Sequence, residues 1–323
     1  MIIDQILTSW NASSRILLTG AANFDGDALG CVLALAEFGE SQGKIMTIAN
    51  ESPICPLFAF ASGSHMVHTD LTGQEFDLII ICDTGSLRML GEIATRYEHI
   101  FKSTPTINID HHGSCYGDIC WSTSGDEYAS ATMMIGEFIQ RIDPNGITHF
   151  IATSLLLGLY FDTECFRNLN TNPRALRFAA DMIESGADHA GLISGLYQST
   201  PACYFRLYGH IMQNIETIAD GAGAVATVRP EFFTSCTVDP DALGNEFVNH
   251  YLRSLAVKFV ILIKDIGHER RISLRSKSSE YNMRELAGIF GGGGHTMASG
   301  ARTEFSRDEC VRMIEESIVN RKK

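Results

Sequence analysis

Carboxylate and imidazole side chains recur through the first half of the chain in an order that suits the binding of divalent cations. The residues concerned are Asp25, Asp27, Asp83, Asp110, His111, His112 and Asp162. Carboxylate oxygens and imidazole nitrogens suit Mn²⁺ or Mg²⁺, and several carboxylates in one place would repel one another without cations. The set therefore indicates a two-metal site, which activates water and stabilises charge on a phosphoryl group under attack.

Short apolar runs precede several of these residues and predict the strands that carry them. Residues 15–19, 76–82 and 106–109 read as buried strands that lead to Asp25, Asp83 and Asp110 respectively. A further strand is expected over 44–49. The helices expected between and after the strands cover about 28–43, 130–142, 148–160, 173–188 and 189–197. This alternation predicts an α/β domain with a largely parallel sheet, whose carboxyl edge is where ligands bind.

Each motif also has a purely structural interpretation. The Asp-Gly-Asp sequence at 25–27 could be a turn, Asp83-Thr84-Gly85 could cap a helix, and His111-His112 could be packing residues. Their ordered recurrence at the ends of predicted strands is what favours a site.

Length and charge suggest two domains and a small anionic ligand. A chain of 323 residues exceeds what one core usually serves. We expect domains at 1–195 and 213–323, joined by a linker at 196–212. Residues 1–250 carry 11 Lys/Arg and 29 Asp/Glu, whereas residues 251–323 carry 14 and 9. Such an acidic protein lacks the basic face that long nucleic acid requires.

The remaining composition is typical of a cytoplasmic protein. No apolar run approaches the roughly 20 residues of a membrane span, and no secretory signal is apparent. The nine cysteines are scattered without CxxC pairs, so we expect reduced thiols. Cys115 and Cys120 could be half of a zinc site, but no second pair lies nearby.

Four ordered motifs resemble those of the DHH phosphoesterases. They are residues 23–30, Cys82-Asp83-Thr84, Ile109-Asp110-His111-His112 and Phe161-Asp162-Thr163. Residues 290–300 resemble the glycine-rich signature of the C-terminal domain associated with that family. Together the motifs span nearly the whole chain. The resemblance implies a parallel-sheet N-terminal DHH domain and a smaller α/β C-terminal domain that binds substrate.

The resemblance also implies a ligand set for two Mn²⁺ ions, with Mg²⁺ as the alternative. One ion would be bound by Asp25 and Asp83, and Asp83 would bridge to the second ion. The other ligands of the second ion would be Asp27, His111 and Asp162.

Catalytic roles follow from the same resemblance, with one departure. Asp110 would orient His111, and His112 would lie near the scissile phosphate. The family normally has a histidine ligand four residues before Asp25, where this chain has Ala21. Three alternatives account for Ala21: an engineered substitution that traps substrate, a natural enzyme with one secure metal, and a non-catalytic binder. We favour the first, because every other motif residue is present.

The four glycines at 291–294 predict a binding site for phosphate, because their backbone N–H groups can approach a ligand closely. A flexible linker is the alternative. Arginine grips phosphate with two parallel hydrogen bonds, so an arginine at the end of a strand is expected to contribute. The substrate-binding residues that we expect are Arg275, Ser276, Gly292, Gly293, Gly294 and His295, with Arg270, Arg271 and Lys277 as further candidates.

The sequence thus predicts a metal-dependent phosphodiesterase that hydrolyses short 5′-phosphorylated oligoribonucleotides, chiefly dinucleotides of the pGpG or pApA type, to mononucleotides. The enzymatic alternative is a phosphatase acting on 3′-phosphoadenosine 5′-phosphate or on inorganic polyphosphate. The alternative from another class is a nucleotide-binding sensor without turnover. Short RNA is the expected partner, with no long nucleic acid and no membrane. A homodimer is left open.

Overall fold

The computed structural model describes residues 2–22, 24–113, 115–123, 127–200, 202–236, 248, 251–252, 256–294 and 296–321. The chain divides into two compact units, residues 1–199 and residues 200–323. Each unit has its own sheet and its own hydrophobic core.

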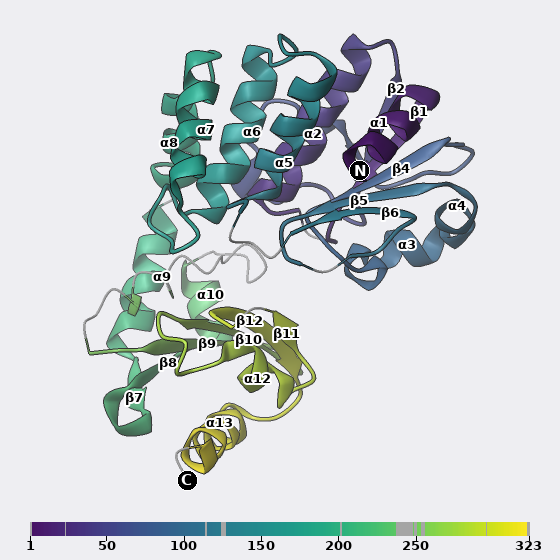
Figure 1. Cartoon of the computed structure of the whole chain (residues 1–323). Helices are drawn as coiled ribbons and strands as arrows, with labels where there is room; N and C mark the ends of the chain where they lie inside the picture. The colour runs from purple at the N-terminus through teal and green to yellow at the C-terminus, as the bar shows by residue number, and fades with distance from the viewer. Residues whose placement is uncertain are drawn as a thin grey trace. The chain divides into compact units, whose positions relative to one another are not determined.

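A six-stranded parallel sheet forms the centre of the N-terminal unit, in the order β3-β2-β1-β4-β5-β6 (Figure 1). Its strands are β1 (Arg15–Thr19), β2 (Ile45–Ala49), β3 (Val67–His68), β4 (Leu78–Cys82), β5 (Thr106–Asp110) and β6 (Ile119–Ser122). The predicted parallel α/β architecture is confirmed. The sequence analysis did not predict β3 and β6, two short strands on the edges of the sheet.

Helices cover both faces of this sheet. They are α1 (Ile2–Ala12), α2 (Gly26–Ser41), α3 (Glu92–Arg96), α4 (Glu98–Ser103), α5 (Ala131–Ile142), α6 (His149–Asp162), α7 (Pro173–Glu184) and α8 (His189–Tyr197). Short 3₁₀ turns lie at Pro56–Phe58, Ser64–Met66 and Leu87–Leu90. The larger core lies between the sheet and α2, α5 and α6, and a smaller one lies beneath α3 and α4.

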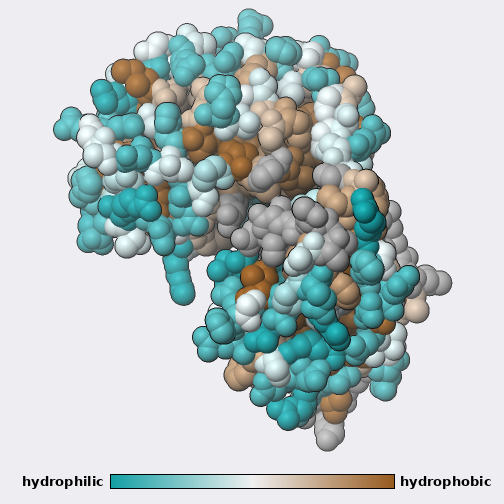
Figure 2. Space-filling model, turned by 180° about the vertical axis from the view of Figure 1, so that it is seen from behind, coloured by the Kyte–Doolittle hydropathy of each residue, from teal (hydrophilic) through white to brown (hydrophobic). Residues whose placement is uncertain are grey.

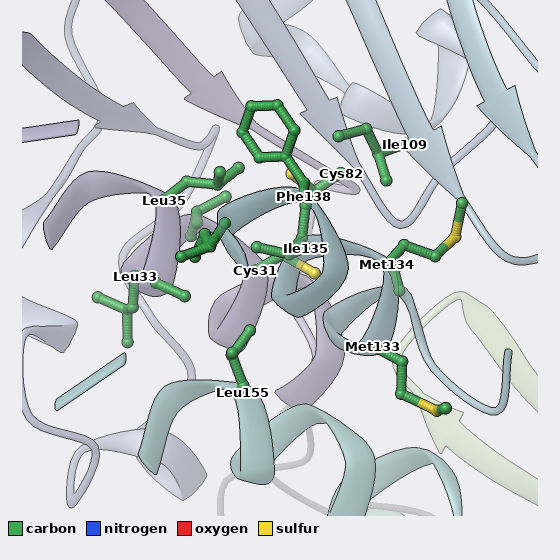
Figure 3. Close-up of a cluster of buried hydrophobic side chains, with 14 of the residues drawn as sticks. Cys31, Leu33, Leu35, Cys82, Ile109, Met133, Met134, Ile135, Phe138 and Leu155 are labelled. Carbon is green, nitrogen blue, oxygen red and sulfur yellow. The ribbon is translucent and has the colours of Figure 1, made fainter. Parts of the chain in front are cut away.

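Helix α2 is buried almost all round, which explains its nearly continuous apolar sequence. Cys31, Leu33 and Leu35 from α2 lie among side chains from β4, β5, α5 and α6 (Figure 3). The helix begins two residues earlier than the predicted Ala28, because the Asp25 side chain caps it by accepting the N–H groups of Asp27 and Ala28.

The C-terminal unit is built on a mixed six-stranded sheet in the order β11-β12-β10-β9-β8-β7. Only the β8–β9 pair is parallel. The strands are β7 (Glu216–Ile218), β8 (Gly223–Val228), β9 (Phe259–Ile266), β10 (Glu269–Ser276), β11 (Gly293–Gly294) and β12 (Ala298–Thr303). Strands β9 and β10 pair in antiparallel orientation along their whole length.

The helices of this unit are α9 (Ala202–Gln213), α10 (Pro230–Cys236), α12 (Met283–Gly288) and α13 (Arg307–Arg321), with a 3₁₀ turn at Ala219–Gly221. Alternate residues of β9 enter two cores. Ile261 and Ile263 join residues of α12 and α13, whereas Val260 and Leu262 join residues of α9 and α10. The segment expected as a linker, 196–212, contains the end of α8 and most of α9.

Two properties of the whole chain bear on the sequence predictions. Cys115 and Cys120 form a disulfide between an exposed loop residue and strand β6, so the expectation of reduced thiols was wrong for this pair. Among the described side chains, six other cysteines are free: Cys31, Cys55, Cys82, Cys165, Cys203 and Cys310. On the visible face of the N-terminal unit, polar residues surround a central patch of apolar residues, and polar residues cover most of the C-terminal unit (Figure 2). No helix among the described residues combines the length and the apolar character that crossing a bilayer requires.

Candidate metal centre

The carboxyl ends of three adjacent strands bring the predicted acidic residues together. β1, β4 and β5 are neighbours that run in the same direction, and each leads into a loop at the same edge. Asp83 directly follows β4 and has a left-handed backbone, with a φ of 55°. Asp110 is the last residue of β5. This edge is the expected location of a ligand site in a parallel sheet.

His111 lies at the centre of the acidic cluster. Its Nε2 atom is 3.0 Å from Oδ2 of Asp162, 3.5 Å from Oδ1 of Asp83 and 3.8 Å from Oδ2 of Asp27. On the other side of the ring, Nδ1 lies 3.4 Å from the carbonyl oxygen of Tyr128. A proton on Nδ1 donated to that carbonyl is the tautomer that leaves Nε2 available to a metal.

His112 makes a separate set of contacts. Its Nδ1 lies 2.7 Å from Oδ1 of Asp110 and 3.5 Å from Oδ1 of Asp83. Because a carboxylate only accepts, Nδ1 of His112 carries the proton in this contact. The predicted role of Asp110 was to orient His111. The contact with His112 is one that the motif did not indicate.

Asp27 is fully buried and is held by the first residues of α5. Its Oδ2 accepts the backbone N–H of Ala131 at 2.5 Å and its Oδ1 accepts that of Thr132 at 3.0 Å. The positive end of a helix favours an anion at this position. Gly158 of α6 allows this packing, because a Cβ atom there would collide with Asp27 and with Thr132.

Two groups of side chains offer ligand atoms that all lie within 4.8 Å of one another. The first is Asp83, His111 and His112, and the second is Asp27, His111 and Asp162. Asp25 belongs to neither group, and its Oδ1 caps α2. The structure thus brings together every predicted ligand except Asp25, and adds His112.

Burial and mutual repulsion raise the pKa values of the four carboxyl groups. Burial, followed by the neighbouring Asp162, raises the pKa of Asp27 to about 6. Burial and nearby aspartates raise the pKa of Asp83 well above its usual value. The pKa values of Asp25 and Asp162 are also raised, chiefly by burial. An unneutralised cluster of this kind is unfavourable at neutral pH.

Contacts within the cluster shift the pKa values of His111 and Asp110 in opposite directions. Burial disfavours charge on His111, but its contacts with Asp162 and Asp83 outweigh burial and hold its pKa well above the usual value. Burial also opposes the ionisation of Asp110, yet its hydrogen bond with His112 lowers the pKa of Asp110. The first pairing places a positive charge where the carboxylates converge.

The donor set fits divalent cations of the Mn²⁺ or Mg²⁺ type. Oδ1 of Asp83 is buried and accepts no hydrogen bond from the described residues, although His111 and His112 are both near it. Carboxylate oxygens and imidazole nitrogens are the ligands such cations prefer. Proton charge on His111 therefore occupies the place that a metal would take.

Residues 15–159 match the DHH family, N-terminal domain. The N-terminal unit therefore belongs to the DHH family. The chain is 27% identical over 241 residues to the bifunctional oligoribonuclease and PAP phosphatase NrnA of Bacillus subtilis, which covers 73% of each protein. It is 30% identical over 215 residues to the Thermus thermophilus protein of that name, covering 66% of this chain and 63% of the relative.

A solved structure shares the whole fold. An exopolyphosphatase-related protein from Bacteroides fragilis superposes with a TM-score of 0.90 and 23% identity, covering 99% of this chain and 96% of that one. Both units therefore follow a known two-unit arrangement of sheets and helices. At this identity the likeness concerns the fold alone.

Ala21 lies in the loop that precedes Asp25, and nothing in the structure explains why an alanine occupies this position. Its carbonyl oxygen accepts a hydrogen bond from Nδ2 of Asn50 at 2.7 Å, and the next N–H donates to the carbonyl of Met89. The loop before Asp25 is thus held by its backbone. The methyl group supplies no ligand atom.

The predicted substrate-binding residues outside the DHH unit are placed on and beside β10. Arg275 is half-buried, and its Nη1 donates to the carbonyl of Leu274 at 3.2 Å. Ser276 is buried, and its Oγ lies 2.8 Å from the carbonyl of Ser278 and 3.3 Å from that of Lys258. Consecutive strand residues point to opposite faces, so the two side chains do not share one face of the sheet.

Close packing against β12 requires glycine at two positions of the glycine run. A Cβ atom at Gly292 would collide with Gly300 and Ala301, and one at Gly294 would collide with Ala298 and Ser299 of β12. Gly294 also has a φ of 134°. Gly293 has open space around it. His295 lies outside the described residues.

Two asparagine side chains that the sequence did not indicate form hydrogen bonds with the backbone beside the candidate ligands. Asn108 is fully buried on β5 and donates from Nδ2 to the carbonyl of Thr84 at 2.6 Å, next to the left-handed Asp83. Asn170 donates to the carbonyls of Ala129 and Asp162. Both side chains donate to backbone carbonyls in other segments of the chain, and no spacing rule reveals such contacts.

Proposed function

We propose that this protein hydrolyses short 5′-phosphorylated oligoribonucleotides, chiefly dinucleotides, to mononucleotides in a reaction that requires divalent cations. The observation that supports this most is the convergence of Asp27, Asp83, His111 and Asp162 at one edge of a DHH-family sheet. The relatives from B. subtilis and T. thermophilus, named as oligoribonucleases, support the substrate class.

We assign the cation ligands as the cluster suggests. Asp83 would help to hold both cations, because its Oδ1 faces both histidines and accepts no hydrogen bond from the described residues. Asp27, His111 and Asp162 would hold one cation, and Asp25 would contribute to holding the other. Cations bound there supply positive charge that neutralises the carboxylates and stabilises a phosphoryl group under attack. The donor set favours Mn²⁺, with Mg²⁺ as the alternative.

The chain's own residues perform the proton transfers. Asp110 fixes the ring of His112 through Nδ1, and the His112 side chain is 29% exposed, so Nε2 can reach solvent or substrate. In the hydrolysis, a P–O bond forms to the water oxygen and the P–O bond to the leaving nucleoside oxygen breaks. The proton released by the attacking water passes to Nε2 of His112, which transfers it to the leaving oxygen, so the ring ends in its starting protonation state. Arg275 and the backbone near Gly293 bind the terminal phosphate.

A second activity is suggested by the names of the relatives. Both are described as PAP phosphatases as well as oligoribonucleases. The same groups would remove the 3′-phosphate of 3′-phosphoadenosine 5′-phosphate, because a phosphomonoester presents the same phosphoryl oxygens to the cluster. The sensor alternative depends on Ala21 alone.

A length series tests the proposed substrate. The chain as given and an Ala21→His variant are incubated with 5′-phosphorylated RNAs of two, three, five and about twenty nucleotides, and with 3′-phosphoadenosine 5′-phosphate. Mn²⁺ and Mg²⁺ are compared. We expect kcat/KM to be highest for the dinucleotide and to fall as the RNA lengthens. Equal values for long RNA and the dinucleotide contradict the proposal.

A further inference from the structure

A single side-chain amide joins two segments that carry the second candidate cation group. Nδ2 of Asn170 donates to the carbonyl oxygen of Ala129 at 2.9 Å and to that of Asp162 at 3.3 Å. Asn170 lies in the loop between α6 and α7, whereas Ala129 precedes α5. The amide therefore ties the start of one helix to the end of another.

The Ala129 end of this bridge supports two of the three ligands. The preceding residue, Tyr128, presents its carbonyl oxygen 3.4 Å from Nδ1 of His111. The residues that follow, Ala131 and Thr132, donate their backbone N–H groups to Asp27. The backbone of 128–132 therefore sets the orientation of the His111 ring and the position of the Asp27 carboxylate.

The Asp162 end supports the third ligand at a place where the backbone is strained. α6 ends at Asp162, so the carbonyl of this residue lies in the turn where helical hydrogen bonding stops. The three residues Glu164, Cys165 and Phe166 then have φ values of 45°, 53° and 68°. Left-handed backbone at non-glycine residues persists only where surrounding contacts hold it. The amides of Asn168 and Asn170 both donate to the Asp162 carbonyl.

We propose that Asn170 is a positioning residue for the cation group of Asp27, His111 and Asp162. The Asn170 amide binds the carbonyl oxygens of both Ala129 and Asp162. It therefore sets the distance between the two segments that position the three ligands. This inference rests on the proposed function, since it assumes that the group binds a cation. Groups that orient metal ligands from behind commonly change metal affinity 10- to 100-fold.

Asn168 offers a matched control. Its Nδ2 donates to the same Asp162 carbonyl at 2.8 Å, but no bond from it to Ala129 is present. Asn168→Ala removes one support of Asp162 and leaves the bridge, whereas Asn170→Ala removes the bridge. Asn170→Ser retains a donor that can reach at most one of the two carbonyls.

Calorimetric titration of the metal-free full chain with Mn²⁺ tests the proposal, with far-UV circular dichroism to verify folding. We expect about 10- to 100-fold weaker Mn²⁺ binding in Asn170→Ala and in Asn170→Ser. Asn168→Ala should stay within about threefold of the wild type. Wild-type affinity in a folded Asn170 variant, or an equal loss in Asn168→Ala, would overturn the assignment.

Measurements of Mn²⁺ binding and of nucleotide hydrolysis test the positioning role of Asn170 and the proposed function separately. Absence of Mn²⁺ binding by the wild-type chain overturns both. Mn²⁺ binding that depends on Asn170, without hydrolysis of any nucleotide, overturns only the proposed function and supports the positioning role.

Discussion

Nε2 of His111 lies 3.0 Å from Oδ2 of Asp162, although the first residue follows a strand and the second ends a helix in the layer beside the sheet. Burial raises the pKa of Asp162, and the same contact helps to raise the pKa of His111. The pair is thus formed by tertiary packing at the point where the other carboxylates converge.

Replacing Asp162 with asparagine should remove one cation ligand and leave the fold intact. We expect Asp162→Asn to weaken Mn²⁺ binding by more than about 100-fold, because a direct ligand should count for more than the groups behind it. Titration calorimetry measures the change.

Asp188→Asn is the matched control for this substitution. Asp188 caps α8 by accepting the N–H of Gly191, and asparagine caps a helix about as well. Mn²⁺ affinity should be unchanged in this variant. Equal affinities in Asp162→Asn and Asp188→Asn would remove Asp162 from the ligand set.

Restoring a histidine at Ala21 should complete the site that includes Asp25. We expect Ala21→His to bind a second Mn²⁺ ion, or to bind its weaker ion at least about tenfold more tightly, because an added imidazole ligand raises metal affinity. The stoichiometry is measured by calorimetry and by elemental analysis after gel filtration. Unchanged stoichiometry and affinity would show that position 21 does not face the site.

Site residues that follow a predicted strand could be identified from the sequence. Contacts with backbone atoms far away along the chain could not. Asp83 and Asp110 could be placed at one edge because buried strands precede them, and parallel strands end together. The support of Asp27 by Ala131 and Thr132 could not be predicted, since no pattern links residues about a hundred positions apart. The cap that Asp25 provides to α2 shows the opposite case, in which a local signal was present but was interpreted as a turn or a metal ligand rather than as a helix cap.

Asn108 should hold Asp83 in its left-handed conformation. Asn108→Asp keeps the shape but places a carboxylate against the carbonyl of Thr84, so we expect a loss of about 2–4 kcal/mol in the free energy of unfolding. Mn²⁺ binding should weaken as well. Thr106→Val is the control, because Thr106 is buried on the same face of β5 and its Oγ1 donates to the nearby Thr104 carbonyl. This substitution should lower the free energy of unfolding by about 1 kcal/mol and leave the affinity for Mn²⁺ unchanged.

The stability of the metal-free protein should fall as the pH rises. The pKa of Asp27 is about 6 in the folded protein, against 3.8 for an ordinary aspartate. A group whose pKa is higher in the folded than in the unfolded state stabilises the folded protein fully at pH values below its unfolded-state pKa. This stabilisation is lost as the pH rises through the folded-state pKa. The raised pKa of His111 acts in the same direction at higher pH.

Denaturant unfolding with a chelator present measures this effect. We expect the free energy of unfolding to fall by about 1 kcal/mol between about pH 5 and pH 7 from Asp27 alone. Saturating Mn²⁺ should abolish the decrease, since bound cations replace the protons. A metal-free protein that becomes more stable over this range would contradict the described electrostatics.

The most direct test of the metal-dependent phosphoesterase is the hydrolysis of a 5′-phosphorylated diribonucleotide by the Ala21→His chain, with Asp83→Asn in the same background as the control. We predict conversion to mononucleotides that requires Mn²⁺, stops with chelator and is lost with Asp83→Asn. Failure of Ala21→His to hydrolyse any dinucleotide or 3′-phosphoadenosine 5′-phosphate with Mn²⁺ would contradict the account.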